Sequence, residues 1–184
     1  MSTVTVYCGA DKNPEFAQEM YALGKMLARH FEEVVYGGGL ENGTMMGELA
    51  RGVLENGGRL KGVISKDYWK EGQIFPEGMT ALAVRSEAER NAITLASDQI
   101  IVAPGQIGTL HESTAALAFN RARIKRDEPV KPLYLLDLKG FFSKLSGFLQ
   151  DSFETFGEAE ENKTRYYQRI GSVAQLSSKI ATKP

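Results

Sequence analysis

Glu112 has the residue type and the position best suited to chemistry, because a glycine-bearing loop comes just before it. An apolar run at residues 100–103, rich in β-branched side chains, ends at Pro104-Gly105, and Gly108-Thr109 then opens a long segment without a helix breaker. That order is typical of a buried strand, a tight loop and the start of a helix. The first N–H groups of a helix have no partner within it and carry partial positive charge, so this loop is suited to hold a phosphate.

Two roles for Glu112 follow from the same spacing. Thr109-Leu110-His111-Glu112 matches the capping box [ST]-x-x-[DE], in which Thr109 would cap the helix and Glu112 would bond back to the cap. A carboxylate beside a phosphate must be held aside to avoid repulsion. In that place it could bind ribose hydroxyls or stabilise a positively charged sugar carbon. The spacing leaves both roles open.

Arg90 is the basic residue that could work with this loop. It lies on the first turns of an expected helix that begins at Ser86, where Ser86 and Glu89 match a second capping box. An arginine near a helix N-terminus opposes the helix dipole. Arg90 is therefore either a solvated helix residue or an anion clamp that reaches into a cleft from the preceding helix.

Glycines also follow two earlier strands. The triplet Gly37-Gly38-Gly39 comes directly after an expected strand at residues 33–36, and Gly9-Ala10 follows one at residues 3–7. The triplet is not the G-x-G-x-x-G fingerprint, because Asn42 stands where its third glycine would be, and the chain has no Walker motif. Three glycines before a helix favour close approach of a ligand to the backbone, although they could simply turn the chain.

Other catalytic chemistries have little support. His30, His111 and Cys8 are the only histidines and cysteine, and their spacing matches no metal-ligand set. No G-x-S-x-G elbow is present for a nucleophilic serine. We therefore expect neither a metal nor a cofactor.

The elements that position these residues alternate along the chain. Expected strands occupy residues 3–7, 33–36, 60–64, 81–84, 100–103 and 133–136, and expected helices begin at Asn13-Pro14 and span residues 44–55, 86–97, a segment from 109, and 141–156. Residues 158–163 are expected to form an exposed loop, with a small helical piece after Ser172. This alternation predicts one domain, residues 1–184, with a doubly wound, Rossmann-like α/β fold whose parallel sheet has helices on both faces. In such folds ligands bind beyond the carboxyl ends of the strands.

Composition limits the class of partner. The chain has 184 residues and a net charge of −1, which gives no electrostatic case for nucleic acid or an anionic membrane. No apolar run approaches the roughly 20 residues that cross a bilayer. The N-terminus lacks the basic and apolar regions of a signal peptide, and one cysteine suits a reducing compartment. We expect a cytoplasmic protein with no nucleic-acid or membrane partner.

Together these motifs resemble the Lonely Guy (LOG) family, whose characterised members release cytokinin bases from nucleoside 5′-monophosphates. Pro104, Gly105, Gly108, Thr109 and Glu112 match the family pattern P-G-G-x-G-T-x-x-E. Arg90 matches the arginine found about one helix earlier. The glycine triplet with Met46-Gly47 is similar to G-G-G-x-x-G-x-M-G, and Val6-Tyr7-Cys8-Gly9-Ala10 to the first strand and turn. Three positions depart from the family: Gln106 replaces its second glycine, Asn91 its lysine, and the segment from Gly39 to Met46 is longer.

The resemblance implies an N-glycosidase that acts on an AMP-like nucleoside monophosphate, with Arg90 and Glu112 as the catalytic pair. It also implies a homodimer. The residues expected to bind the nucleotide or its phosphate are Gly9, Ala10, Gly37, Gly38, Gly39, Gly105, Gln106, Gly108 and Thr109. Some relatives carry the label lysine decarboxylase, but pyridoxal-phosphate chemistry needs a Schiff-base lysine and a larger scaffold than this chain offers.

Two alternatives remain. The altered Gln106 loop is compatible with a nucleotide-binding or sensing module that does not turn its ligand over. A similar carboxylate could also transfer deoxyribose between bases.

Overall fold

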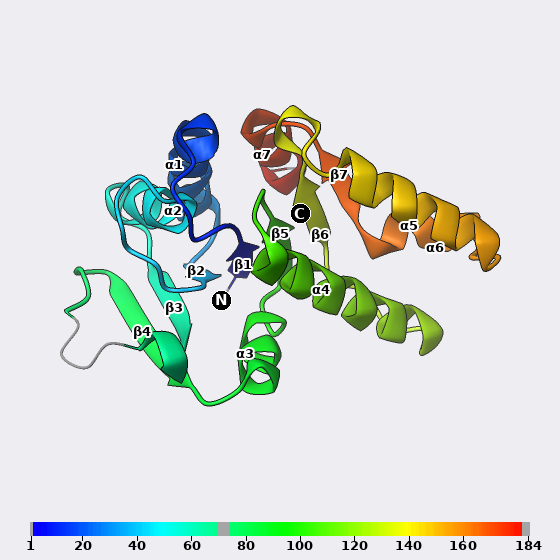
Figure 1. Ribbon diagram of the computed structural model, residues 1–184, viewed down its shortest axis with the longest axis horizontal. Helices are drawn as coiled ribbons and strands as arrows, with labels where there is room; N and C mark the ends of the chain where they lie inside the picture. Colours follow the sequence, from blue (N-terminus) through cyan, green and yellow to red (C-terminus); the bar gives the residue numbers. More distant parts are fainter. Residues whose placement is uncertain (1, 70–73, 182–184) are drawn as a thin grey trace.

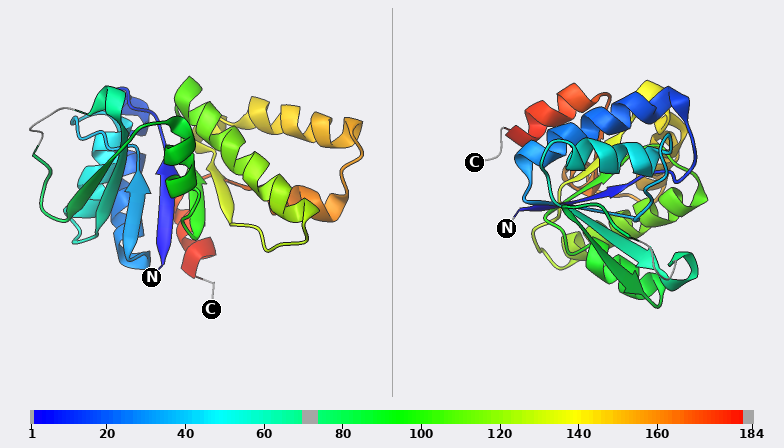
Figure 2. Two further views of the ribbon diagram at one scale, coloured as in Figure 1. Left: turned by 90° about the horizontal axis from the view of Figure 1, so that it is seen from below. Right: turned by 90° about the vertical axis from the view of Figure 1, so that its left-hand side faces the viewer.

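A parallel sheet forms the centre of the computed structural model, which describes residues 2–69 and 74–181. Within these residues seven parallel strands lie in the order β4-β3-β2-β1-β5-β6-β7 (Figure 1; Figure 2, left). The strands are β1 (Thr3–Tyr7), β2 (Glu33–Tyr36), β3 (Leu60–Ser65), β4 (Met79–Val84), β5 (Gln99–Val102), β6 (Leu133–Leu136) and β7 (Gln168–Ile170). The doubly wound α/β fold expected from the alternation is confirmed.

The strand order creates a switch point between β1 and β5. The chain starts in β1, moves outward through β2 and β3 to β4, and then returns to place β5 on the other side of β1. Tyr7 pairs with Val102, so both strands end at the same level of the sheet. The Gly9 N–H donates to the Pro104 carbonyl at 3.0 Å, which holds the two following loops side by side. Ligands of doubly wound sheets bind at such a switch point.

Helices cover both faces of the sheet (Figure 1). They are α1 (Pro14–His30), α2 (Met45–Leu54), α3 (Glu87–Thr94), α4 (Ile107–Lys125), α5 (Ser143–Thr155), α6 (Glu160–Tyr166) and α7 (Val173–Ala181), with short 3-10 turns η1 (Lys66–Tyr68) and η2 (Leu138–Gly140). The helices α1, α2 and α7 lie on one face, while α3 and α4 lie on the other. The pair α5 and α6 extends beyond the β7 end of the sheet, where α6 packs against α4 (Figure 2).

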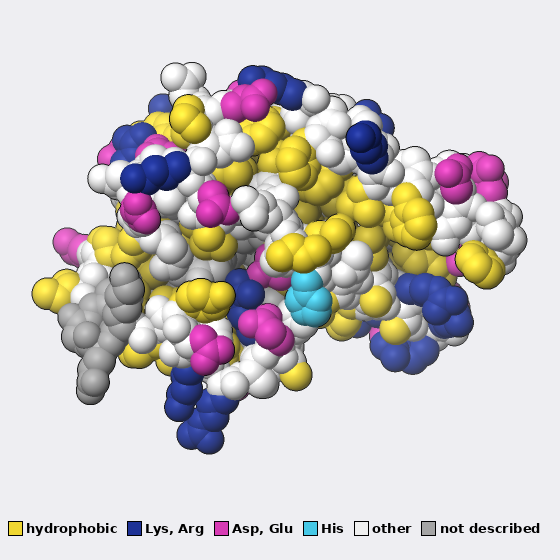
Figure 3. All heavy atoms as spheres, viewed as in Figure 1, with side chains coloured by type: hydrophobic (Ala, Val, Ile, Leu, Met, Phe, Trp, Pro, Cys, Tyr) yellow, Lys and Arg dark blue, Asp and Glu magenta, His cyan; other side chains and the backbone are white. Residues whose placement is uncertain are grey.

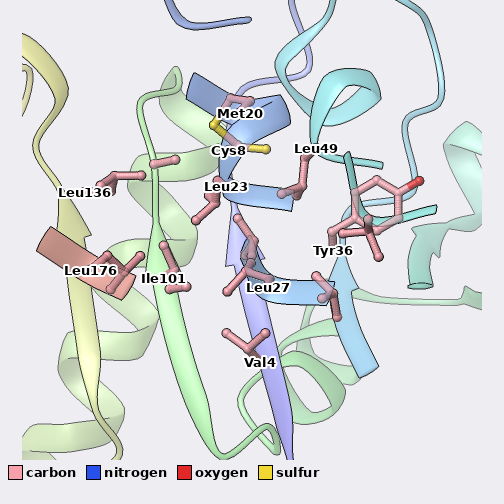
Figure 4. Close-up of a cluster of buried hydrophobic side chains, with 14 of the residues drawn as sticks. Val4, Cys8, Met20, Leu23, Leu27, Tyr36, Leu49, Ile101, Leu136 and Leu176 are labelled. Atoms are coloured by element: carbon pink, nitrogen blue, oxygen red, sulfur yellow. The ribbon is translucent and has the colours of Figure 1, made fainter. Parts of the chain in front are cut away.

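Alternating side chains divide the core between these two layers. Val4 and Val6 of β1 pack with Leu23 and Leu27 of α1, whereas Tyr7 packs on the opposite face against the α4 layer. Figure 4 shows the larger cluster beneath α1, α2 and α7. Each strand of a parallel sheet covered on both faces must be apolar on both sides, which explains the nearly continuous apolar runs in the sequence.

Caps explain where two helices begin. The Asn13 side chain accepts a hydrogen bond from the Glu15 N–H at 3.1 Å, and Pro14 occupies the first turn of α1. Ser86 Oγ accepts from the Glu89 N–H at 3.2 Å at the start of α3. Both starts agree with the caps expected from the sequence.

Several expected boundaries were wrong. Helix α4 begins at Ile107 with Gln106 as its N-cap, so Thr109 is the third helical residue and not the cap. Helix α6 begins within the segment expected to be an exposed loop; its acidic first turn and basic last turn suit a helix, and its last residue, Tyr166, is buried. The short strand β7 was not expected, because two of its three residues are exposed and show no apolar run.

No described helix combines the length and the apolar character needed to cross a membrane.

Candidate functional site

A cavity of about 640 Å³ lies beyond the carboxyl ends of β1, β2, β3 and β5. Figure 3 shows the hollow, in which basic and acidic side chains meet between apolar ones. The cavity is lined by ten of the residues singled out in the sequence: Gly9, Ala10, Gly37, Gly38, Gly39, Arg90, Gln106, Gly108, Thr109 and Glu112. Gly105 lies behind this surface and does not line the cavity.

The remaining lining residues were not among those expected from the sequence to bind the ligand or to act on it. They are Cys8, Asp11, Leu40, Glu41, Thr44, Met46, Ile64, Ser65, Tyr68, Glu87 and Ile107. Ile64, Ser65 and Tyr68 enter because β3 lies beside β2, a neighbour relation that residue spacing does not reveal. The loops after β1 and β2 are tied together above the cavity by a hydrogen bond from the Met45 N–H to the Asp11 carbonyl at 3.2 Å.

Arg90 and Glu112 form an ion pair at this site. Arg90 Nη2 lies 2.6 Å from Glu112 Oε1, and their side chains are only 17% and 6% exposed. The Arg90 guanidinium also lies 3.5 Å from Glu87 and donates from Nε to the Val63 carbonyl at 3.4 Å. The interpretations of Arg90 as a solvated helix residue and of Glu112 as a capping carboxylate are therefore both wrong.

Buried hydroxyl groups fix the helix that carries Arg90. The Tyr7 hydroxyl donates to Thr94 Oγ1 at 2.7 Å, and Thr5 Oγ1 donates to the Thr94 carbonyl at 2.7 Å. Because Thr94 is the last residue of α3, these bonds hold the end of that helix against β1. Arg90, one turn earlier, is thereby directed toward α4.

The electrostatic environment of Glu112 has opposing parts. Burial raises the pKa of the Glu112 carboxyl, while Arg90 lowers it and the negative charge of Glu87 raises it further. The net effect is to raise the pKa of Glu112 above the ordinary glutamate value. A carboxyl with a raised pKa and a specific charged partner in a cavity is a candidate functional group.

The N-terminus of α4 opens onto the same cavity. Its N-cap Gln106 makes no side-chain capping bond, and the first turn of the helix carries no acidic residue. Four carboxylates, those of Asp11, Glu41, Glu87 and Glu112, line the cavity with the single guanidinium of Arg90. Among the described lining residues, the backbone N–H groups at the start of α4 are therefore better suited to face an anion than cationic side chains are.

Gly105 and Gly108, at the start of α4, differ in whether the surrounding structure requires glycine. A Cβ on Gly105 would lie 2.1 Å from Thr109 Oγ1 and 2.8 Å from the Gly9 nitrogen, so packing requires glycine there. A Cβ on Gly108 would meet nothing within 4 Å. The protein itself leaves that space open, and Gly108 is one of the residues that line the cavity.

The glycine triplet makes room for the ion pair. A Cβ on Gly37 would lie 2.7 Å from Met46 Cε and 3.2 Å from Arg90 Nη2. Gly38 has a positive φ of 94°, and a Cβ there would lie 2.2 Å from Ile64 Cγ1. The triplet thus serves both the turn after β2 and the close packing around Arg90.

Among the described residues, no group of three or more His, Cys, Asp or Glu side chains is arranged to hold a metal ion.

The family comparison agrees with the motifs. A family model described as "Possible lysine decarboxylase" matches residues 46–180. This chain belongs to that family, the LOG family. It is 28% identical over 152 residues to the cytokinin riboside 5′-monophosphate phosphoribohydrolase of Rhodococcoides fascians, covering 80% of this chain and 74% of the relative. It is 30% identical over 158 residues to a probable enzyme of the same name from Oryza sativa subsp. japonica, covering 83% of this chain and 65% of the relative.

Solved structures of other proteins share the fold. The molybdenum cofactor carrier protein of Chlamydomonas reinhardtii aligns with a TM-score of 0.67 and 18% identity over 99% of both chains. The molybdenum cofactor binding protein of Rippkaea orientalis aligns with a TM-score of 0.64 and 19% identity, covering 98% of this chain and 96% of that one. At these identities the likeness shows the fold alone.

The buried ion pair predicts a specific stability pattern. Arg90→Met should lower the free energy of unfolding by roughly 2–5 kcal/mol, because it leaves Glu112 buried without its partner. The loss should shrink as the pH falls: the raised pKa of Glu112 would rise further without Arg90, and the folded state then gains stability by taking up a proton.

Urea unfolding of the wild type, Arg90→Met and the double variant Arg90→Met/Glu112→Gln over a range of pH would measure this pattern. The double variant should be more stable than Arg90→Met at neutral pH. A double variant no more stable than Arg90→Met would contradict this pattern, because it would show that the unpaired Glu112 carboxylate costs the folded state nothing.

Proposed function

We propose that this protein hydrolyses the N-glycosidic bond of a nucleoside 5′-monophosphate, releasing a free base and ribose 5-phosphate. The observation that carries the proposal is the buried Arg90–Glu112 pair, which shares one cavity with the open N-terminus of α4. The names of the relatives support it, and they make a cytokinin riboside 5′-monophosphate and AMP the first substrates to test.

The 5′-phosphate binds at the start of α4 in this proposal. Gly108 leaves open space beside the first N–H groups of the helix, where partial positive charge favours an anion. Gln106 adds an amide side chain to the same wall of the cavity. Binding energy gained at the phosphate positions the sugar carbon without involving the bond that breaks.

Glu112 stabilises the reacting carbon. As the C1′–N bond breaks, positive charge develops on C1′ and the ring oxygen, and an ionised carboxylate nearby lowers the energy of that state. The oxygen of a water molecule then bonds to C1′, and a proton from that water ends on the departing base. The carboxylate also orients the water.

Arg90 keeps Glu112 ionised. Burial alone would favour the protonated carboxyl, and the guanidinium at 2.6 Å opposes that tendency. The contacts of Arg90 with Val63 and Glu87 fix the orientation of its guanidinium. The paired Glu112 carboxylate is thereby held away from the proposed phosphate position at the start of α4. Arg90 can also contact the departing base or the phosphate as an anion clamp.

Lysine decarboxylation, which the family description mentions, has no support at this site. No lysine of the described residues lines the cavity, and Lys12 at its rim is paired with Glu41 at 3.0 Å. A Schiff-base cofactor needs a lysine that faces the site.

Base release from AMP and from N6-prenylated AMP, followed by chromatography, tests the proposal. Glu112→Gln should lower kcat by about 10²–10³-fold, because the charge that stabilises the transition state is lost. The control is Glu154→Gln, which replaces an exposed carboxylate on α5 and should retain full activity. Nucleotide binding by the wild type without any base release would contradict hydrolysis and leave a nucleotide-binding module.

The pH dependence tests the state of Glu112. Because the active form is the carboxylate and its pKa is raised, kcat/KM should fall on the acid side at a pH above the ordinary glutamate pKa of about 4.3. The residual activity of Glu112→Gln should lack this limb. An acid limb at or below the ordinary value would show that another group controls the rate.

The Gly108→Ala variant tests whether the 5′-phosphate binds at the start of α4. Alanine is favoured over glycine inside a helix by about 1 kcal/mol, and its Cβ would meet no protein atom, so the melting temperature should stay the same or rise. The added methyl group would occupy the space of the anion, and KM should rise by about tenfold or more. A variant with unchanged KM would place the phosphate elsewhere.

The resemblance also suggests a homodimer. Ile107 and Leu110 on α4 are exposed apolar residues that a partner subunit could cover. Light scattering should then give twice the chain mass of 20.3 kDa. A mass of one chain at working concentration would contradict this expectation.

A further inference from the structure

Two large exposed apolar side chains line the cavity. Tyr68 of η1 and Ile107 of α4 are each 79% exposed, although both belong to its wall. A large apolar surface facing water is unfavourable unless something covers it. Their positions differ, because Tyr68 follows β3 and Ile107 follows β5.

These two residues mark opposite ends of the site. β2 and β1 lie between β3 and β5, so three inter-strand spacings of about 4.8 Å, roughly 14 Å in total, separate the two strands. The Arg90–Glu112 pair lies between the ends, because Arg90 contacts Val63 of β3 on one side and Glu112 of α4 on the other. Ile107 belongs to the helix N-terminus that holds the phosphate in our proposal, which leaves Tyr68 at the far end.

Apolar side chains share the cavity lining with Tyr68. Ile64, which also lines the cavity, lies against Gly38, and Met46 covers Gly37 and Gly39 with its thioether. Leu40 adds a further aliphatic side chain to the lining. A flat aromatic group fits such a wall better than a sugar or a phosphate, because it buries apolar surface without leaving polar groups unpaired.

From this arrangement we propose that Tyr68 stacks on the nucleobase of the substrate and determines which bases are accepted. This rests on the proposed function, since it takes the nucleotide to lie with its phosphate at α4. The ligand class is a nucleoside 5′-monophosphate with a large base, a purine rather than a pyrimidine, because a larger ring system covers more of the tyrosine face.

Direct binding measurements separate base recognition from phosphate recognition. Isothermal titration calorimetry with AMP, CMP and ribose 5-phosphate would be run on the wild type, Tyr68→Ala and Tyr68→Phe. Tyr68→Ala should weaken AMP binding by about tenfold or more, while ribose 5-phosphate, which has no base, binds as before. Tyr68→Phe keeps the ring and should bind AMP within about twofold of the wild type.

A matched control and a turnover measurement complete the test. Phe156→Ala removes an aromatic ring that is 84% exposed outside the cavity, and AMP binding should not change. In hydrolysis, Tyr68→Ala should raise KM for AMP more than KM for CMP and leave kcat nearly unchanged. An equal loss for AMP and ribose 5-phosphate, or no loss for AMP, would overturn the stacking role.

The two proposals fail in different ways. Wild-type protein that binds AMP through Tyr68 but releases no base would overturn hydrolysis and support stacking. Base release with AMP affinity unchanged in Tyr68→Ala would support hydrolysis and overturn stacking. Wild-type protein that binds none of the three ligands would overturn both.

Discussion

The buried contact between Arg90 and Glu112 constrains the helices, strands and glycine loop that surround it. An ion pair this buried is costly unless its geometry is good and its remaining polar atoms find partners. The fold meets that requirement with a helix end tied to β1 through Tyr7 and Thr94, and with glycine at position 37, where a side chain would press on the guanidinium. Because the two charged residues belong to helices that follow different strands, their meeting depends on the order in which the sheet is wound.

Much of this architecture could be predicted from local patterns. Apolar runs located six of the seven strands that the structure describes, because strands buried on both faces of a sheet are largely apolar. The loops after β1, β2 and β5 were found because glycine and proline mark chain turns. The role of Glu112 could not be settled in this way, since Thr-x-x-Glu fits a capping box and the choice depends on where α4 begins. Tyr68 was missed because its place beside the other loops follows from β3 pairing with β2.

Proteins that share this fold are described with different functions. Solved structures with this fold are described as binding or carrying molybdenum cofactor, whereas the curated sequence relatives are described as phosphoribohydrolases. A fold of this kind offers helix N-termini and glycine loops at one edge, which suit any phosphate-bearing ligand. What distinguishes one such protein from another must therefore lie in the side chains that line the cavity. In this chain the lining includes the Arg90–Glu112 pair and Tyr68.

The strand order also has a consequence for how the chain acquires its shape. β1 precedes the other strands in the chain, but one of its two neighbours in the sheet is β5, and Thr3 meets Asp98, 95 positions further along the chain. Closing a loop of that length is entropically costly and slow, so this pairing belongs late in folding. A nascent chain that ends before β5 contains the strands β1–β4 but neither the Glu112 carboxylate nor the start of α4. Ligand binding would therefore report completed folding and stabilise only the finished molecule.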